Sequence, residues 1–211
     1  MEVTKEMLNQ ALAQRIGKET FEKLSQSAVA VVGLGGLGSH IAVMLARSGV
    51  GKLFLVDFDT VDITNLNRQA YRISDIGRPK TEALQGILRE INPYIEVATA
   101  HCKVNEKNAA ALFGSYSIVC EAFDVAEEKA MLVNTLLEQC PNTTVISGVG
   151  MAGSGSSNDI TTKRVMRRLY LCGDGKSDVA QGLGLTAPRV TVCAGHQGNM
   201  AVRLILGEEE S

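Results

Sequence analysis

The chain has 211 residues, 45% of them hydrophobic and 21% charged, and its formal net charge at pH 7 is −2. These values are ordinary for a one-domain globular protein and give no whole-chain sign of nucleic-acid or membrane binding. The first ten residues contain no apolar run, because Glu2, Lys5 and Glu6 are charged. The most apolar stretch, residues 28–38, is short and glycine-rich. Neither a signal peptide nor a membrane span is expected, and we predict a cytoplasmic protein.

The cysteines indicate reduced thiols. The chain has five of them, namely Cys102, Cys120, Cys140, Cys172 and Cys193. Their number is odd, their spacings are wide and they form no C-x-x-C pair, so we expect no zinc site. A cytosolic protein is the simplest interpretation.

Helical and strand patterns alternate along the chain. Two short helices are predicted over 4–13 and 18–26. Strands are predicted over 28–33, 52–57, 95–100, 117–121 and 144–147. Further helices are predicted over 37–48, from about Pro79 to just before Pro93, and over 105–113 and 126–139. This alternation predicts an α/β fold with a Rossmann-like, doubly wound, mainly parallel sheet.

The last part of the chain is rich in glycine. Residues 148–160 and 173–186 are expected to be mobile loops, with a strand over 163–171 and a final helix over 188–206. Too little chain remains there for a second domain. We expect one domain over 1–211, composed of a helical segment (1–27), a core (28–150) and a C-terminal region of loops and helix (151–211).

A glycine-rich turn, GLGGLG at residues 33–38, follows the first predicted strand. Gly33 allows the tight bend, Gly35 lets the backbone approach a phosphate, and Gly38 lets the helix pack on the sheet. The N–H groups at the helix N-terminus then face an anion. The pattern predicts that the core binds a nucleotide, and a purely structural turn is the alternative.

Two acids, Asp57 and Asp59, stand at the end of the second predicted strand. An acid at this position suits the hydroxyl pair of a ribose. The glycine turn and the acid by themselves would suit an NAD-dependent oxidoreductase.

Polar residues beyond this strand favour a nucleotide with a free polyphosphate instead. Asn65 can donate to ribose or phosphate, and Arg68 can meet the phosphate charge. Lys80 stands in the first turn of a predicted helix, where the helix dipole disfavours a cation unless an anion is bound. A solvated loop is the alternative for Asn65 and Arg68. Arg68 and Lys80 argue against an NAD-dependent oxidoreductase, and so does the absence of a separate substrate domain.

Asp124 follows the fourth predicted strand. Polar residues at the carboxyl ends of parallel strands line the ligand crevice. Asp124 could therefore hold a magnesium ion that bridges phosphate oxygens. It could also be the N-cap of the helix over 126–139, and the two roles are compatible.

Four motifs together resemble the ThiF/MoeB/HesA family of adenylating enzymes, which are relatives of the ubiquitin-activating enzymes. They are GLGGLGS, VDFDTVDITNLNRQ, DIGRPKTEAL and FDVAEEK, and the resemblance covers about residues 15–206. Within the family, the chain is most similar to the short ThiF-type proteins of thiamine synthesis.

The resemblance implies ATP and Mg²⁺ as cofactors. Gly36 would contact phosphate and Asp57 the ribose, while Asp124 would hold the magnesium. Asn65, Arg68 and Lys80 would face the triphosphate. It also implies a homodimer, in which an N-terminal arginine reaches the partner's site, and Arg15 is the candidate.

The implied reaction is adenylylation of the C-terminal glycine carboxylate of a small ubiquitin-like sulfur carrier ending in Gly-Gly. A molybdopterin carrier or a carboxylate on a tRNA base is the alternative acceptor, although the net charge of −2 argues mildly against tRNA. A non-catalytic nucleotide-binding protein is a further alternative, which the intact phosphate-facing residues disfavour.

The chain departs from the family in its cysteines. Paired C-x-x-C zinc ligands, which many relatives carry, are missing, and the stretch before Ala187 and Pro188 lacks the reactive cysteine that some relatives have there. Cys172 is the nearest upstream thiol. Adenylation is therefore expected, whereas a covalent intermediate on Cys172 is not the favoured interpretation.

Overall fold

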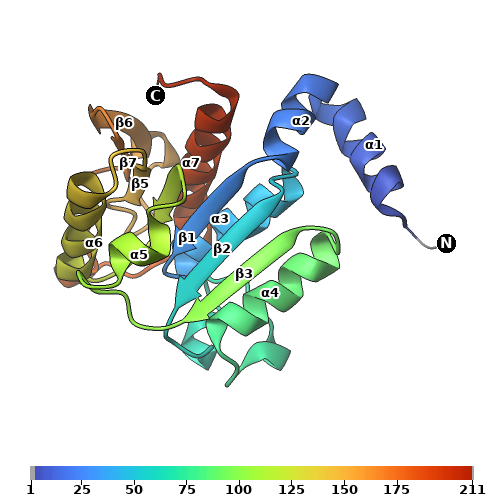
Figure 1. Cartoon of the computed structure of the whole chain (residues 1–211). Helices are drawn as coiled ribbons and strands as arrows, with labels where there is room; N and C mark the ends of the chain where they lie inside the picture. The colour runs from blue at the N-terminus through green and yellow to red at the C-terminus, as the bar shows by residue number, and fades with distance from the viewer. Residues whose placement is uncertain (1–2, 211) are drawn as a thin grey trace.

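A computed structural model describes residues 3–210, which fold around one seven-stranded sheet (Figure 1). The strand order is β3-β2-β1-β4-β5-β7-β6. The strands are β1 (Ala28–Val32), β2 (Lys52–Asp57), β3 (Glu96–His101), β4 (Ile118–Glu121), β5 (Thr144–Gly148), β6 (Thr161–Met166) and β7 (Leu169–Gly173). All neighbouring pairs are parallel except β6 and β7, which are antiparallel. The predicted doubly wound, mainly parallel α/β fold is confirmed.

Helices cover both faces of this sheet. One face carries α3 (Gly36–Arg47), α4 (Lys80–Ile91) and α7 (Ala187–Leu206), and the other carries α5 (Ala109–Phe113) and α6 (Ala126–Gln139). Successive side chains of a strand point to opposite faces, so the apolar run of β1 supplies both cores. Val29 and Val31 belong to the first core, and Ala30 and Val32 to the second.

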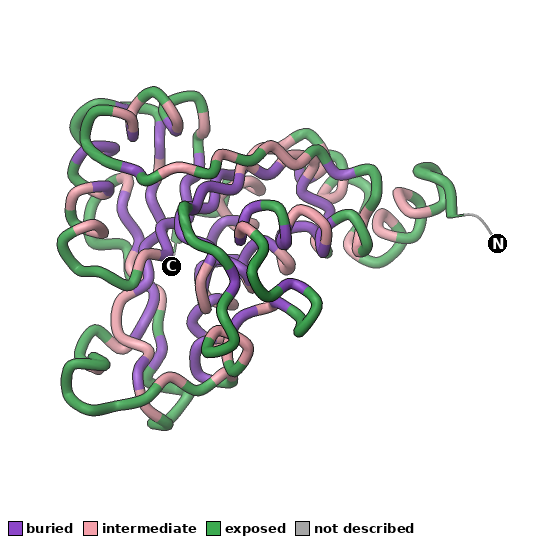
Figure 2. The backbone as a smooth tube through the Cα atoms, turned by 90° about the horizontal axis from the view of Figure 1, so that it is seen from below, coloured by how far each residue is buried: buried purple, intermediate pink, exposed green. Residues whose placement is uncertain are grey.

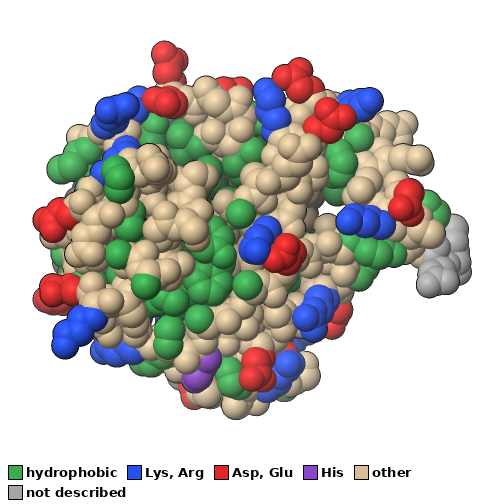
Figure 3. Space-filling view, in the orientation of Figure 1, with side chains coloured by type: hydrophobic (Ala, Val, Ile, Leu, Met, Phe, Trp, Pro, Cys, Tyr) green, Lys and Arg blue, Asp and Glu red, His purple; other side chains and the backbone are tan. Residues whose placement is uncertain are grey.

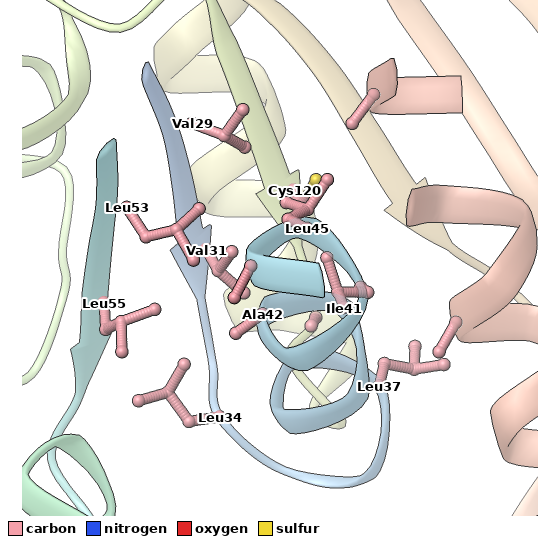
Figure 4. Packing of buried hydrophobic residues seen from close by; sticks show 14 of the residues in the cluster. Val29, Val31, Leu34, Leu37, Ile41, Ala42, Leu45, Leu53, Leu55 and Cys120 are labelled. Atoms are coloured by element: carbon pink, nitrogen blue, oxygen red, sulfur yellow. The ribbon is translucent and has the colours of Figure 1, made fainter. Parts of the chain in front are cut away.

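The packing of α3 fixes the glycine turn against the sheet. Figure 4 shows Val31 of β1 and Cys120 of β4 next to Leu45 and Ile41 of α3. All four are fully buried. Burying an aliphatic side chain of this size stabilises the fold by about 1.5–3 kcal/mol. Buried residues follow the strands and inner helix faces, whereas exposed residues gather in the loops (Figure 2).

The N-terminal helices differ in their attachment. The second, α2 (Lys18–Ser25), is anchored by the buried Leu24. The first, α1 (Lys5–Ile16), has no buried residue and projects from the sheet (Figure 1). None of the helices between residues 3 and 210 is long and apolar enough to cross a membrane.

Two predicted elements need correction. The strand predicted over 163–171 is an antiparallel pair, β6 and β7, because the chain reverses at Arg167 and Arg168. The helix predicted from residue 105 begins at Ala109. The side chains of Asn105 and Asn108 accept backbone N–H groups of that segment and form a turn instead. The division of the chain at residues 27 and 150 stays a prediction, and the sheet continues past residue 150 into β6 and β7.

Candidate active site

A pocket lies at the carboxyl ends of β1, β2 and β4. From β1 the chain builds the sheet outward through β2 and β3 on one side and then through β4 and β5 on the other, so the pocket lies at the point where the strand order reverses. This is the position at which doubly wound sheets bind ligands. Segments distant in the sequence meet there. The predicted site residues that line the pocket are Gly33, Gly35, Gly36, Asp57, Asp59, Asn65, Arg68, Lys80 and Asp124.

The glycine turn needs its glycines for space as well as for bending. Gly33 has a φ of +82°, and a Cβ there would lie 2.9 Å from the carbonyl oxygen of Ala122. Gly38 is not part of the pocket lining. A Cβ on Gly38 would lie 1.8 Å from the carbonyl oxygen of Gly33, so its role is the close packing of α3 on the turn. Gly35 is the N-cap of α3 and carries no side chain, which leaves the helix N-terminus open to an anion.

Asp57 braces the turn as well as lining the pocket. Its carboxylate accepts the backbone N–H of Leu34 at 2.6 Å and that of Asp59 at 2.7 Å. Burial raises the pKa of Asp57, and the ammonium of Lys80 and these two N–H groups partly oppose the rise. The brace was not visible in the sequence, because Leu34 and Asp57 belong to different strand–loop junctions.

Lys80 is held in place by Asp59. Its Nζ lies 2.8 Å from Asp59 Oδ2, and the side chain of Lys80 is 8% exposed. From the sequence, we expected a bound anion to offset the unfavourable interaction between the Lys80 ammonium and the helix dipole. In the structure Asp59 supplies that charge, so the ammonium is positioned before any anion arrives.

Arg68 and Asn65 lie on the loop that connects β2 to α4. Arg68 Nη1 donates to the carbonyl oxygen of Thr64 at 3.2 Å and to Asn67 Oδ1 at 2.9 Å. Asn65 Oδ1 accepts the backbone N–H of Asp62 at 3.0 Å. Both side chains therefore shape the loop, as the structural alternative held, and both also line the pocket.

Two residues outside the predicted site hold this loop against the glycine turn. The hydroxyl of Tyr71 donates to the carbonyl oxygen of Leu34 at 2.8 Å. A ring nitrogen of His40 lies 3.2 Å from the carbonyl oxygen of Arg68, and burial lowers the pKa of His40. An aromatic residue in an otherwise polar loop was the one signal for Tyr71.

Asp124 lines the pocket but does not cap α6. The N-cap residue is Val125, so the N-cap interpretation of Asp124 is wrong. The loop that carries Asp124 is held by Glu121, a fully buried acid. Its carboxylate accepts the N–H of Phe123 at 2.7 Å, an N–H of Lys129 at 2.6 Å and the hydroxyl of Ser147.

The donor set at Asp124 fits magnesium, which favours one or two carboxylates together with phosphate and water oxygens. Glu128 adds a second carboxylate to the same pocket wall, but its Oε1 lies 2.8 Å from Lys103 Nζ, so Asp124 is the better candidate ligand. Among residues 3–210, no cluster of three or more His, Cys, Asp or Glu side chains is arranged as metal ligands.

Arg15 is the one predicted catalytic residue that the structure leaves outside the pocket lining. It is exposed in the last turn of α1. Its assignment therefore stays a proposal that depends on a second copy of the chain.

Cys172 is poorly suited to nucleophilic chemistry. It is fully buried in β7, and burial raises the pKa of its thiol to about 11 despite a hydrogen bond between the thiol and the hydroxyl of Thr162. A nucleophilic cysteine needs an accessible thiolate. The structure therefore favours a packing role.

Thiol labelling tests this interpretation. Of the five cysteines, Cys102 is partly exposed and the other four are buried. We expect a chromogenic disulfide reagent at pH 8 to modify about one thiol rapidly in the native protein and the rest after denaturation. Cys102→Ser should remove the rapid phase and Cys172→Ser should leave it. Rapid modification of Cys172 would contradict the packing role.

Comparisons with known proteins agree with the motifs. The chain matches the ThiF family over residues 8–211. It is 40% identical to tRNA threonylcarbamoyladenosine dehydratase of Bacillus subtilis over 139 residues, which are 65% of this chain and 54% of that protein. It is 30% identical to molybdopterin-synthase adenylyltransferase of Escherichia coli over 194 residues, 88% of this chain and 76% of that protein.

A crystal structure of E. coli tRNA N6-threonylcarbamoyladenosine dehydratase in complex with ATP has the same fold. The TM-score is 0.87, with 98% of each chain covered and 21% sequence identity. The chain spans about half (54%) of the length of the B. subtilis relative. The prediction of an enzyme agrees with the names of these relatives. Because the family match covers almost the whole chain, this protein belongs to the ThiF family.

Proposed function

We propose that the protein adenylylates the C-terminal glycine carboxylate of a small ubiquitin-like sulfur carrier of the ThiS type, using ATP and Mg²⁺ and releasing pyrophosphate. The observation that carries this proposal is the convergence of the glycine turn, Asp57, Arg68, Lys80 and Asp124 on one pocket. An anion-binding helix terminus, two cations and a free carboxylate are what a magnesium triphosphate requires. The adenylyltransferase name of the E. coli relative supports the reaction class.

The reaction needs no general base. A C-terminal carboxylate has a pKa of about 3.5 and is ionised at neutral pH. Its oxygen attacks the α-phosphorus, the bond from that phosphorus to the bridging oxygen of the β-phosphate breaks, and pyrophosphate leaves with the electron pair. An acyl-adenylate remains on the carrier.

The main obstacle is repulsion between the carboxylate and the polyphosphate. Arg68 and Lys80 would neutralise phosphate charge, and the N–H groups at the start of α3 would bind the phosphate oxygens. Lys80 is already fixed by Asp59, so its charge needs little reorganisation. Asp124 would hold magnesium, whose chemistry is charge neutralisation on the leaving phosphates. Catalysis would consist of positioning and charge neutralisation.

The finer parts of the proposal concern the biological setting. We place the reaction in the formation of the thiazole part of thiamine, in the cytoplasm. We also propose a homodimer in which Arg15 of one copy reaches the other copy's pocket. The exposed α1, which carries Arg15, is compatible with such an exchange.

A second acceptor, a carboxylate on a tRNA base, is favoured by the 40% identity to the B. subtilis dehydratase. Two observations favour the carrier. Acidic and basic side chains are mixed over the face shown in Figure 3, which is unlike the basic stripe typical of nucleic-acid binding. In addition, the two glycine-rich segments each place an apolar residue, Met151 and Leu185, in the pocket lining, which suits an uncharged peptide tail more than a nucleic acid.

ATP–pyrophosphate exchange tests the proposed function. With Mg²⁺ and a ThiS-like carrier ending in Gly-Gly, we expect exchange well above background. A carrier that lacks the final Gly-Gly should support none. Exchange that appears only with tRNA would establish the alternative acceptor, and exchange with neither would contradict carboxylate adenylation by this chain.

A further inference from the structure

Three segments of the C-terminal region meet at the guanidinium of Arg189: the segment after β5, the loop after β7, and the first turn of α7, which carries Arg189 itself. Arg189 is 4% exposed. Its Nη2 lies 2.6 Å from Asp174 Oδ2, and its Nη1 donates to the carbonyl oxygen of Ser156 at 2.6 Å. A cation in the first turn of a helix is opposed by the dipole, and a buried charge needs a partner. Asp174, whose side chain is 1% exposed, meets both needs.

Asp174 in turn organises the loop after β7. Its Oδ1 accepts the backbone N–H of Lys176 at 2.9 Å and that of Ser177 at 2.8 Å. The ion pair therefore ties this loop to α7, while the bond to Ser156 ties the segment after β5 to the same guanidinium. Both segments were expected to be mobile. The structure gives them specific contacts, and their mobility stays a prediction.

Glycines let the backbone pack directly on this ion pair. A Cβ on Gly150 would lie 2.2 Å from Asp174 Oδ1, and one on Gly155 would lie 3.5 Å from the guanidinium carbon of Arg189. Between them, Gly153 donates its N–H to the carbonyl oxygen of Gly184 at 2.7 Å. At these three positions the backbone of residues 148–156 packs directly on the ion pair and on the segment that leads to Leu185. Residues 148–156 and that segment together form one wall.

This wall reaches the nucleotide pocket. Met151, Leu185 and Val190 line the pocket, one from each of the segments joined at Arg189. Val190 stands beside the N-terminus of α3, since a Cβ on Gly36 would lie 2.9 Å from its Cγ1. Asn67 Nδ2 donates to the carbonyl oxygen of Leu185 at 3.2 Å, which links the wall to the Arg68 loop.

We infer that Arg189 is a positioning residue for the acceptor. With Asp174 it sets the glycine-rich wall along which an extended, narrow peptide tail would approach the phosphate site at Gly36. The inference rests on the proposed function and deepens it. Arg189 itself lies outside the pocket lining, so it would act through Met151, Leu185 and Val190.

The test compares two probes in the full-length protein by titration calorimetry. One probe is ATP with Mg²⁺, and the other is a non-hydrolysable acyl-sulfamoyl adenosine whose acyl part is a Gly-Gly peptide. We expect Arg189→Lys and Asp174→Asn to weaken the peptide-bearing probe about tenfold or more, because the wall is displaced. The affinity for ATP should change less than about twofold. In exchange assays, KM for the carrier should rise more than kcat falls.

Arg168→Lys is the matched control. Arg168 also spreads its guanidinium over several carbonyl oxygens, those of Leu137, Cys140 and Thr143, at 2.6–2.8 Å. It lies outside the pocket lining. This variant should lower the melting temperature without changing the ratio of the two affinities.

The outcomes separate the two levels of the proposal. Adenosine monophosphate, titrated as a third ligand, is the reference that lacks the peptide. If the wild-type protein does not bind the peptide-bearing probe more tightly than adenosine monophosphate, the proposed function fails and the positioning role fails with it. If the wild-type protein shows the preference and Arg189→Lys keeps it, only the positioning role is overturned. Equal losses for both probes would reduce Arg189 to a structural residue.

Discussion

Arg68→Ala is expected to lower the rate of ATP–pyrophosphate exchange by about 10²–10³-fold, which corresponds to about 2.7–4 kcal/mol. Arg68 lines the pocket, and of the arginines and lysines on the loop from residue 58 to residue 79 it is the one in that lining. ATP binding should weaken as well, by about 1.5–3 kcal/mol, as for the loss of a charge-assisted hydrogen bond. Stability should change little, because the hydrogen bonds of Arg68 within the loop are exposed.

Arg72→Ala is the matched control for Arg68. Arg72 lies on the same loop, but its Nη1 is 2.7 Å from Glu90 on the surface, where an ion pair contributes about 0–1 kcal/mol. Exchange rate and ATP affinity should therefore match those of the unmodified protein. Calorimetry with ATP and Mg²⁺ serves both variants and does not depend on the acceptor. Equal ATP affinity for Arg68→Ala and Arg72→Ala would remove Arg68 from the site.

Gly38→Ala is expected to destabilise the protein by about 3 kcal/mol or more, the upper end of the cost of overpacking. The new Cβ would lie 1.8 Å from the carbonyl oxygen of Gly33. That residue cannot easily yield, because its N–H donates to the carbonyl oxygen of Val56 at 2.9 Å and its φ is +82°. Movement of α3 away from the turn should also weaken ATP binding. Urea denaturation followed by circular dichroism measures the first effect.

Gly86→Ala provides the contrast in a neighbouring helix. Gly86 lies inside α4, and a Cβ there would have no atom within 4 Å among the described residues. Alanine is favoured over glycine in a helix interior by up to about 1 kcal/mol, so this variant should be more stable than the unmodified protein. Similar unfolding midpoints for Gly38→Ala and Gly86→Ala would show that the close packing at Gly38 is not needed.

Local patterns in the sequence were sufficient for most of the sheet. The apolar run over Val29–Val32 reads as a strand buried on both faces, which is how β1 lies in the structure. The glycine turn and Asp57 follow it at the spacing of a nucleotide-binding unit. Where local signals were weak, the prediction was wrong. Residues 163–171 contain no glycine, proline, asparagine or aspartate to mark a turn, so the reversal at Arg167 that separates β6 from β7 was not predicted.

The approach of Arg68, Lys80 and Asp124 to one pocket could also be expected from the sequence, since the carboxyl ends of parallel strands meet at one edge. Their individual surroundings could not. The ion pair between Lys80 and Asp59 depends on how the loop from Thr60 to Pro79 folds back. A backbone bridge between Thr60 and Pro79 closes that loop.

The sequence by itself therefore determined the fold class, the family and most of the candidate residues that meet in the pocket, because these depend on local periodicity and on motifs of contiguous residues. Only the tertiary structure decided which charges are paired, that Cys172 is buried, that Arg15 lies outside its own pocket lining, and that Arg189 joins two glycine-rich segments. Those properties depend on contacts between residues far apart in the chain. Such contacts form only after the sheet has set the positions of its loops.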